Sequence, residues 1–245
     1  MKDLILDGDC KIGSKGKKVK LIQEWLSIHG IHLAIDGDFG PATDYAVRQF
    51  QKKKKLKVDG VVDSQTFERL TQPMSKSLKT IAPRGKTLGD LVVSYGQQHL
   101  AQHPIEIGGQ NKGPWVRLYM KGHEGPDWPW CAGFVSFVLK QASDTIGQQP
   151  PIKATFSCDI LAASARENGF FLGESKIQNK NQITPGSLFL NRRTSTDWVH
   201  TGIVVKAEND FYHTIEGNTN DEGSREGYEV CKRIRGYKKK DFILI

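Results

Sequence analysis

The sequence lacks any apolar run long enough to cross a bilayer, and its first residues, Met1–Asp7, lack the apolar core of a signal peptide. We therefore expect no stable membrane insertion. We also expect synthesis in the cytoplasm without a signal peptide, so that any export uses a specialised route or follows lysis.

Cysteine is scarce, with four residues at positions 10, 131, 158 and 231 and no CxxC spacing. This set gives neither a dense disulfide framework nor the usual ligand pattern of a zinc site. We expect no cofactor and no obligatory metal.

Acidic residues are too few to balance the basic ones, and the formal net charge is +8. A basic surface attracts any polyanion, so charge alone names no partner. The run Lys52–Lys55 has no interleaved aromatic residues, which favours a solvated loop or helix end. No nucleic-acid reader motif is present, so we do not expect nucleic acid as a partner.

The most informative segment surrounds Cys131. Pro129 cannot lie inside a helix, whereas apolar residues recur at helical spacing after Cys131. We therefore expect Cys131 in the first turn of a helix or just before it. There the helix dipole favours a thiolate, and unpaired backbone N–H groups could hold an oxyanion.

A base for this thiol is expected downstream, where His200 opens a β-branched run that indicates a strand. A second strand, Phe211–Asn218, follows the turn Glu208–Asp210. If the two strands pair as a hairpin, Glu216 or Asn218 can reach the far imidazole nitrogen of His200 and fix its tautomer. The sequence leaves open which of the two does so.

These residues also have plainer interpretations. Cys131 could be a buried structural thiol. Cys158 also opens a helix, but Asp159 opposes thiolate formation there, so we expect a core or linker cysteine. His213 flanks apolar residues on a core face, which favours a structural histidine. His123 lies in a loop near Cys131, and a role in substrate binding stays open for it.

Together these segments resemble a CHAP domain, the papain-like family of cysteine amidases and peptidases of bacterial cell walls. The resemblance covers roughly the last 150 residues. It implies that Cys131 is the nucleophile, that His200 is the base, and that Glu216 and Asn218 orient the histidine. The segments that carry it are Trp130–Ala132, Pro185–Gly186, His200–Val204 and Glu216–Asn218.

Two further features adjoin this pattern. Trp128 and Trp130 crowd the nucleophile and are predicted to bind substrate, although either could be a core anchor. Ser187 stands where the family usually has Asp, which alters no catalytic residue.

The front of the chain contains a weak internal repeat, in which Ile35–Thr43 is echoed by Val58–Thr66. Each copy has an Asp-Gly turn followed by apolar residues at helical spacing. Another amphipathic segment precedes them, so three short helices are expected to form a small bundle. This part resembles a peptidoglycan-binding domain found in many wall hydrolases. By that resemblance, the candidate contacts with glycan or stem peptide are Asp36, Asp38, Phe39 and Thr43.

The length favours two domains. We predict an all-α three-helix peptidoglycan-binding domain at residues 1–72, a linker at 73–86, and an α+β papain-like domain with an antiparallel sheet at 87–245. The strands expected in the second domain are 187–191, 201–207, 211–216 and 229–235.

These observations predict a monomeric, cysteine-dependent peptidoglycan amidase or endopeptidase, held on the wall by its front domain. The bond cut could be the N-acetylmuramoyl–L-alanine amide or a peptide bond of the stem or cross-bridge. A phage endolysin and an injected effector both fit, and the effector would have an immunity protein as partner. The alternatives are a catalytically degenerate wall-binding protein and a thiol enzyme that acts on another small amide or thioester.

Overall fold

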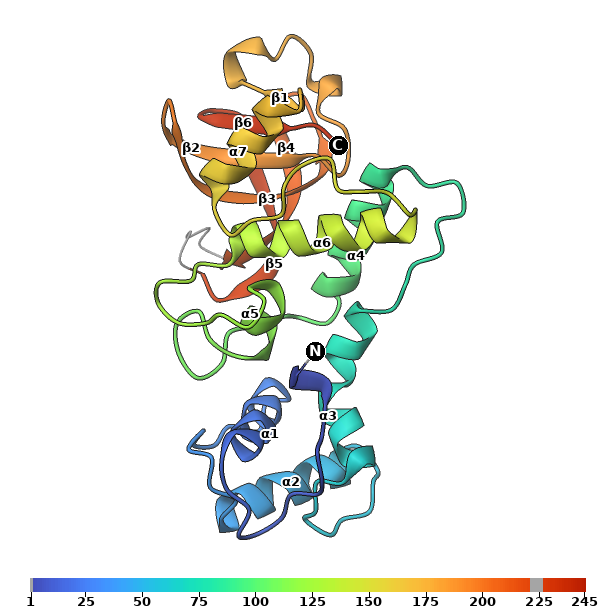
Figure 1. Cartoon of the computed structure of the whole chain (residues 1–245), viewed down its shortest axis with the longest axis vertical. Coiled ribbons are helices and arrows are strands. Elements are labelled where there is room, and N and C mark those ends of the chain that lie inside the picture. The colour runs from blue at the N-terminus through green and yellow to red at the C-terminus, as the bar shows by residue number, and fades with distance from the viewer. Residues whose placement is uncertain (1, 221–226) are drawn as a thin grey trace.

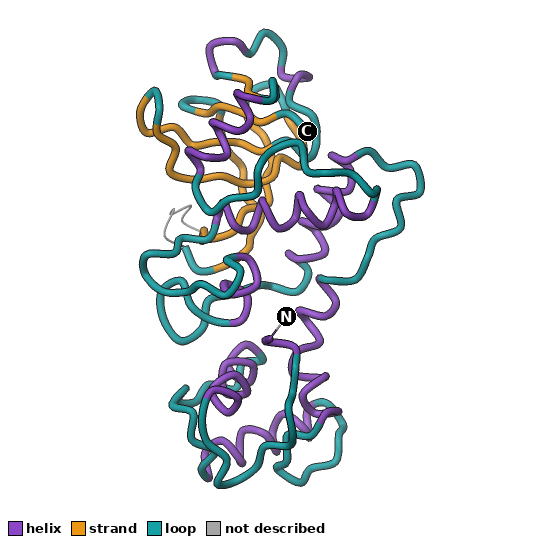
Figure 2. Tube along the Cα trace, viewed as in Figure 1, coloured by secondary structure: helices purple, strands orange, loops and turns teal. Residues whose placement is uncertain are grey.

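The computed structural model describes residues 2–220 and 227–245 (Figure 1). Helices fill the first part of the chain and strands the last part (Figure 2). The described α-helices are α1 (Lys17–Ile28), α2 (Pro41–Lys53), α3 (Ser64–Ser77), α4 (Leu88–Leu100), α5 (Pro114–Tyr119), α6 (Cys131–Thr145) and α7 (Cys158–Glu167). The strands are β1 (Phe171–Leu172), β2 (Leu188–Thr194), β3 (Asp197–Ala207), β4 (Phe211–Thr219), β5 (Glu229–Gly236) and β6 (Lys240–Ile243). Short 3₁₀ turns lie at Lys2–Leu4, Glu174–Lys176 and Lys180–Gln182.

Helices α1, α2 and α3 form the front domain, at the lower end of the molecule in Figure 1. Pro41 begins α2, where its missing N–H costs no helical hydrogen bond. Asp63 caps α3 by accepting from the backbone N–H of Thr66 at 2.7 Å. The predicted helical front domain therefore fits the structure. Helix α3 continues to Ser77, past residue 72, so the domain boundary stays a prediction.

The second domain is built on a six-stranded antiparallel sheet with strand order β1-β6-β2-β3-β4-β5. Helices α4, α6 and α7 contact its central strand β3. Side chains alternate along β3, so Ile203 packs in the helical core while Val204 packs in a second core with Phe189 and Tyr212. The expected antiparallel sheet is present. Strands β1 and β6 were missed, because neither short segment shows a strand pattern of its own.

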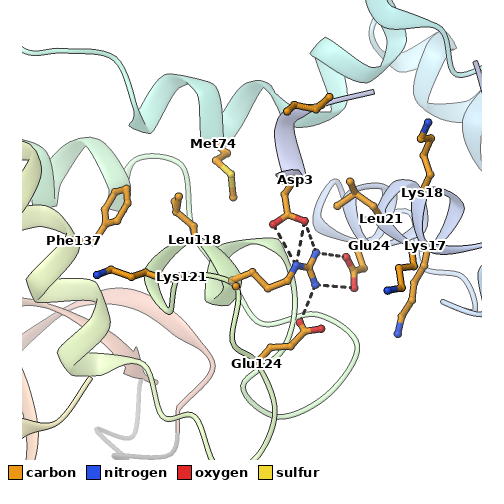
Figure 3. Close-up of a pocket in the computed structure, with 14 residues that line it drawn as sticks. Asp3, Lys17, Lys18, Leu21, Glu24, Met74, Leu118, Lys121, Glu124 and Phe137 are labelled. Atoms are coloured by element: carbon orange, nitrogen blue, oxygen red, sulfur yellow. Dashed lines mark hydrogen bonds and ion pairs between the residues drawn. The ribbon is translucent and has the colours of Figure 1, made fainter. Parts of the chain in front are cut away.

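The carboxylates of Asp3, Glu24 and Glu124 converge where the two domains meet (Figure 3), and all three pair with Arg117 of α5. Its guanidinium lies 3.0 Å from the Asp3 carboxylate, 2.6 Å from Glu24 of α1 and 2.8 Å from Glu124. Trp25 and Trp115 meet edge to face beside this cluster, with ring centroids 6.3 Å apart. A cavity of about 800 Å³ opens at the same junction. The front domain is therefore joined to the second by partly buried ion pairs and by shared apolar packing.

The structure also bears on membrane insertion and on the basic run at residues 52–55. Within residues 2–220 and 227–245, no helix has both the length and the apolar character needed to span a bilayer. The run Lys52–Lys55 ends helix α2, and positive charge at a helix C-terminus is favourable.

Candidate functional site

Each Asp-Gly turn of the front domain is held by one buried glutamine. In the first copy, the Gln23 amide of α1 donates to the Asp36 carboxylate at 2.8 Å and to the Thr43 hydroxyl at 3.1 Å. Its carbonyl oxygen accepts from the backbone N–H of Gly37 at 2.8 Å. The Gln23 side chain thus hydrogen-bonds both to the Asp36 carboxylate and to the Gly37 backbone N–H of the turn.

The second copy repeats this arrangement with Gln51 of α2. Its amide donates to Asp59 at 3.0 Å and to Thr66 at 3.4 Å, and its carbonyl accepts from Gly60 N–H at 3.0 Å. Hydrogen bonds from the Val61 N–H and from Gln51 lower the pKa of Asp59 to about 2. The sequence repeat is therefore also a structural repeat. The two glutamines that hold its turns, Gln23 and Gln51, were not identified from the sequence.

The four residues expected to contact glycan or peptide divide into two groups. Phe39 is fully buried and Thr43 nearly so, which places both in the support of the turn. Asp36 and Asp38 lie at the surface. Asp38 is half exposed and pairs with Lys15 at 3.0 Å. The first turn therefore exposes the carboxylates of Asp36 and Asp38, whereas Phe39 and Thr43 are buried and support it.

In the second domain, the structure brings Cys131, His200 and Glu216 together. Cys131 is the first residue of α6, as expected from Pro129 and the apolar pattern that follows. Cys131 and His200 lie close enough to shift each other's pKa, although His200 Nδ1 makes no hydrogen bond within the described residues. His200 Nε2 lies 2.8 Å from Glu216 Oε2, so Glu216 makes this contact.

Glu216 is completely buried and its carboxylate is surrounded by donors. Arg235 of β5 donates twice, at 2.8 Å from Nε and 2.6 Å from Nη2. The Thr214 hydroxyl donates at 2.5 Å. A buried carboxylate needs such partners to remain charged. Arg235 is a site residue that sequence reasoning missed. The register opposite β4 places it across from Tyr212.

These contacts shift the pKa values in a consistent direction. Burial alone would lower the pKa of His200, but its interactions with Cys131 and with the Glu216 carboxylate raise it to about 9. Burial would raise the pKa of Glu216, but hydrogen bonds from Arg235 and His200 lower it to about 2. A hydrogen bond from Cys158, followed by His200, holds the pKa of the Cys131 thiol well below its ordinary value. The arrangement therefore favours a thiolate beside an imidazolium.

Cys158 lies much closer to Cys131 than the sequence suggested, with 3.9 Å between the two sulfurs. It begins α7, and its side chain is buried. The expectation of a core or linker cysteine identified its burial but not its contact. No local pattern could have shown that contact, because it depends on how α7 packs beside α6.

Two glycines allow this close assembly. A Cβ at Gly217 would lie 2.8 Å from the Trp130 ring and 2.9 Å from Phe134, so α6 could not approach β4 as it does. A Cβ at Gly202 would lie 2.6 Å from the Glu216 side chain. The glycines of the His200–Gly202 and Glu216–Asn218 segments therefore make room for the site.

The other residues predicted near the site are placed as follows. Trp130 is fully buried, and its Nε1 donates to Glu106 at 2.8 Å, so it is a core anchor with no free face for substrate. Trp128 is half-buried and stacks on His123, with 4.1 Å between ring centroids. Asn218 is buried with a left-handed backbone. His213 lies on the opposite face of β4 from Glu216, as the alternation predicts.

Across residues 2–220 and 227–245, no cluster of three or more His, Cys, Asp or Glu side chains is placed to hold a metal ion. The described residues therefore do not fit a zinc centre.

Comparison with known proteins identifies the front domain. Residues 15–70 match the family model described as "Putative peptidoglycan binding domain". The zinc D-Ala-D-Ala carboxypeptidase of Streptomyces albus G is 40% identical over 68 residues, which are 26% of this chain and 27% of the relative. The chain thus spans about a quarter of that curated relative. It carries a peptidoglycan-binding domain, which implies action at the cell wall.

Solved structures give similar partial matches. A fused Zn-dependent amidase/peptidase/peptidoglycan-binding domain-containing protein from Clostridium acetobutylicum ATCC 824 is 45% identical, with a TM-score of 0.27, over 27% of this chain and 30% of that one. A Burkholderia AP3 phage endolysin is 24% identical, with a TM-score of 0.26, over 44% of this chain and 41% of that one.

The prediction of a cysteine-dependent peptidoglycan amidase or endopeptidase is wrong by these comparisons. The curated relative that matches this chain is named as a zinc carboxypeptidase, not as a cysteine enzyme. The cysteine mechanism was expected from the pattern around Cys131 and His200 and from the resemblance of the second domain. The matches support wall association without that mechanism.

Proposed function

We propose that this chain binds peptidoglycan through residues 15–70 and acts on the wall as a hydrolase of its amide bonds. The observation that carries this proposal is the family match of the front domain. Support comes from the similarity to a protein named as a zinc D-Ala-D-Ala carboxypeptidase. The bond is the N-acetylmuramoyl–L-alanine amide or a peptide bond of the stem or cross-bridge.

We propose separately that the second domain has a CHAP-type, papain-like arrangement and that Cys131, His200 and Glu216 form a reactive thiol centre. A helix-borne thiol, a histidine on β3 and a carboxylate on β4 follow one another in the chain and meet in space. This geometry supports nucleophilic reactivity of the thiol. It assigns no peptidoglycan bond to the thiol.

One experiment tests the hydrolase and separates it from the thiol. Purified sacculi are incubated with the wild-type chain, with Cys131→Ala, and with wild type plus a zinc chelator, and the products are identified by mass spectrometry. We expect the wild-type chain to release fragments cut at an amide bond. Intact sacculi that retain bound protein would overturn the hydrolase and favour the degenerate wall-binding alternative.

The other two arms identify the mechanism. Loss of product with the chelator alone would place this chain with its zinc-named relatives. Loss of product in Cys131→Ala alone would contradict a zinc-dependent mechanism.

Deletion of residues 1–72 is a poor control for targeting. The deletion would remove Glu24 and Trp25, which pack against Arg117 and Trp115 of the second domain. Point substitutions at the surface of the first turn avoid this damage.

A further inference from the structure

Cys131 and Cys158 form a dithiol pair at the first residues of two helices. Their sulfurs lie 3.9 Å apart although 27 positions separate them in the chain. Their side chains are 5% and 7% exposed. All four cysteines of the chain lie among the described residues, and none of them is in a disulfide.

Hydrogen bonds on both sides fix the position of Cys158. The Ser136 hydroxyl of α6 donates to the Thr155 carbonyl at 2.9 Å and accepts from the Thr155 N–H at 3.1 Å. On the other side, the Asp159 carboxylate accepts from the Trp198 backbone N–H at 2.8 Å. The start of α7 is therefore tied to α6 and to β3, the elements that carry Cys131 and His200.

We propose that Cys131 and Cys158 are an oxidation site, at which a hydroperoxide is reduced and the two thiols become a reversible disulfide. The proposal goes beyond wall hydrolysis and does not depend on it, because its readout is covalent and needs no peptidoglycan.

The reaction has two balanced steps. The Cys131 thiolate attacks the hydroperoxide, so that an S–O bond forms, the O–O bond breaks, and the alkoxide or hydroxide leaving group takes the proton of the His200 imidazolium. The Cys158 sulfur then attacks the Cys131 sulfenic acid, forming the S–S bond and releasing water with the thiol proton. The hydroperoxide gains two electrons and the dithiol loses two.

The pKa shifts of Cys131 and Cys158 indicate which thiol reacts first. The contact with Cys131, together with burial, raises the pKa of Cys158 well above its ordinary value, and the same contact holds the pKa of Cys131 well below its own, so Cys131 is the more acidic of the two thiols. Conversion of Cys131 to a sulfenic acid removes one cause of the raised pKa of Cys158, its contact with the Cys131 thiolate. The more acidic thiol is therefore expected to be oxidised first, and Cys158 to attack second.

The distance is short enough for closure. A disulfide has sulfurs about 2 Å apart, so rotation of the two side chains must shorten their separation by about 2 Å. The disulfide would remove the thiolate from His200 and make Cys131 unreactive toward alkylating agents until it is reduced.

The test treats the full-length protein with one equivalent of hydrogen peroxide, blocks the remaining thiols, and maps the peptides by mass spectrometry. We expect a linked peptide pair that contains Cys131 and Cys158, has lost the mass of two hydrogens, and separates on reduction with dithiothreitol. Iodoacetamide labelling of Cys131 should be lost on oxidation by at least about tenfold and return on reduction.

Two cysteine variants test whether Cys158 is the thiol that attacks the Cys131 sulfenic acid. Cys158→Ser should leave the Cys131 sulfenic acid to be trapped by dimedone, whereas Cys10→Ser, at another buried cysteine, should behave as wild type. Diamide treatment of the wild-type chain tests closure without any variant. Absence of the linked peptides with both oxidants, or equal trapping of the sulfenic acid in wild type and Cys158→Ser, would overturn the proposal.

Discussion

The front domain and the second domain position their polar residues by different means. In the front domain, one glutamine holds each turn over a short stretch of chain, with 13 positions between Gln23 and Asp36 and 8 between Gln51 and Asp59. In the second domain, Glu216 is held by strands on both sides, and the thiol comes from a helix far upstream. Contacts between residues close together in the chain, such as those of the two glutamines, can be seen as a repeat in the sequence. Contacts between distant residues, such as those of Cys131 and Glu216, depend on sheet register and helix packing.

The largest expected effect in this comparison comes from Glu216→Ala. The substitution leaves Arg235 and His200 without their buried carboxylate, and breaking a buried ion pair costs roughly 3–5 kcal/mol. We expect a lower free energy of unfolding in chemical denaturation and slower alkylation of Cys131. Glu208→Ala is the matched control, because Glu208 pairs with Lys206 near the surface. Equal stability of the two variants would show that the Glu216 contacts contribute little.

A smaller effect is expected from Gln23→Ala and from Gln51→Ala. Each removes one side chain that holds a turn, and leaving buried polar groups unsatisfied costs about 1–3 kcal/mol. Because the two glutamines make matching contacts, we expect similar losses, measured by urea denaturation. A loss confined to one variant would show that the two copies of the repeat are not equivalent in the folded domain.

The smallest expected effect is a flat pH profile for the alkylation of Cys131. Its thiol pKa lies well below the ordinary value, and the pKa of His200 is about 9, so the thiolate–imidazolium pair persists between them. The iodoacetamide rate at Cys131 should change little from pH 7 to 8. Burial raises the pKa of Cys10, so its rate should rise about tenfold per pH unit. A tenfold rise at Cys131 would contradict the ion pair.

The sequence predicted those parts of the site that local pattern controls. Pro129 and the apolar spacing located Cys131 at a helix start, and strand alternation placed Glu216 where it meets His200. The hairpin around Glu208–Asp210 is also present.

Other contacts could not be predicted because they depend on tertiary packing. The Cys158 contact follows from the placement of α7, and the burial of Trp130 follows from the approach of α6 to Gly217. A weaker signal for Arg235 was available, since a buried carboxylate on β4 requires a cation on a neighbouring strand. The cysteine dependence of the predicted hydrolase is wrong by the comparisons, because local pattern and a resemblance of the second domain do not identify the reaction that a thiol performs.

The most direct test of the account is co-sedimentation of the protein with purified sacculi. The account predicts that the wild-type chain sediments with the wall and that Asp38→Ala binds about tenfold more weakly, a change of about 1.4 kcal/mol. Asp38 is 51% exposed at the first turn, so its loss should leave the turn intact. Asp7→Ala, at an exposed carboxylate outside residues 15–70, should bind as wild type. A wild-type chain that stays in the supernatant would contradict the central claim that the front domain binds peptidoglycan.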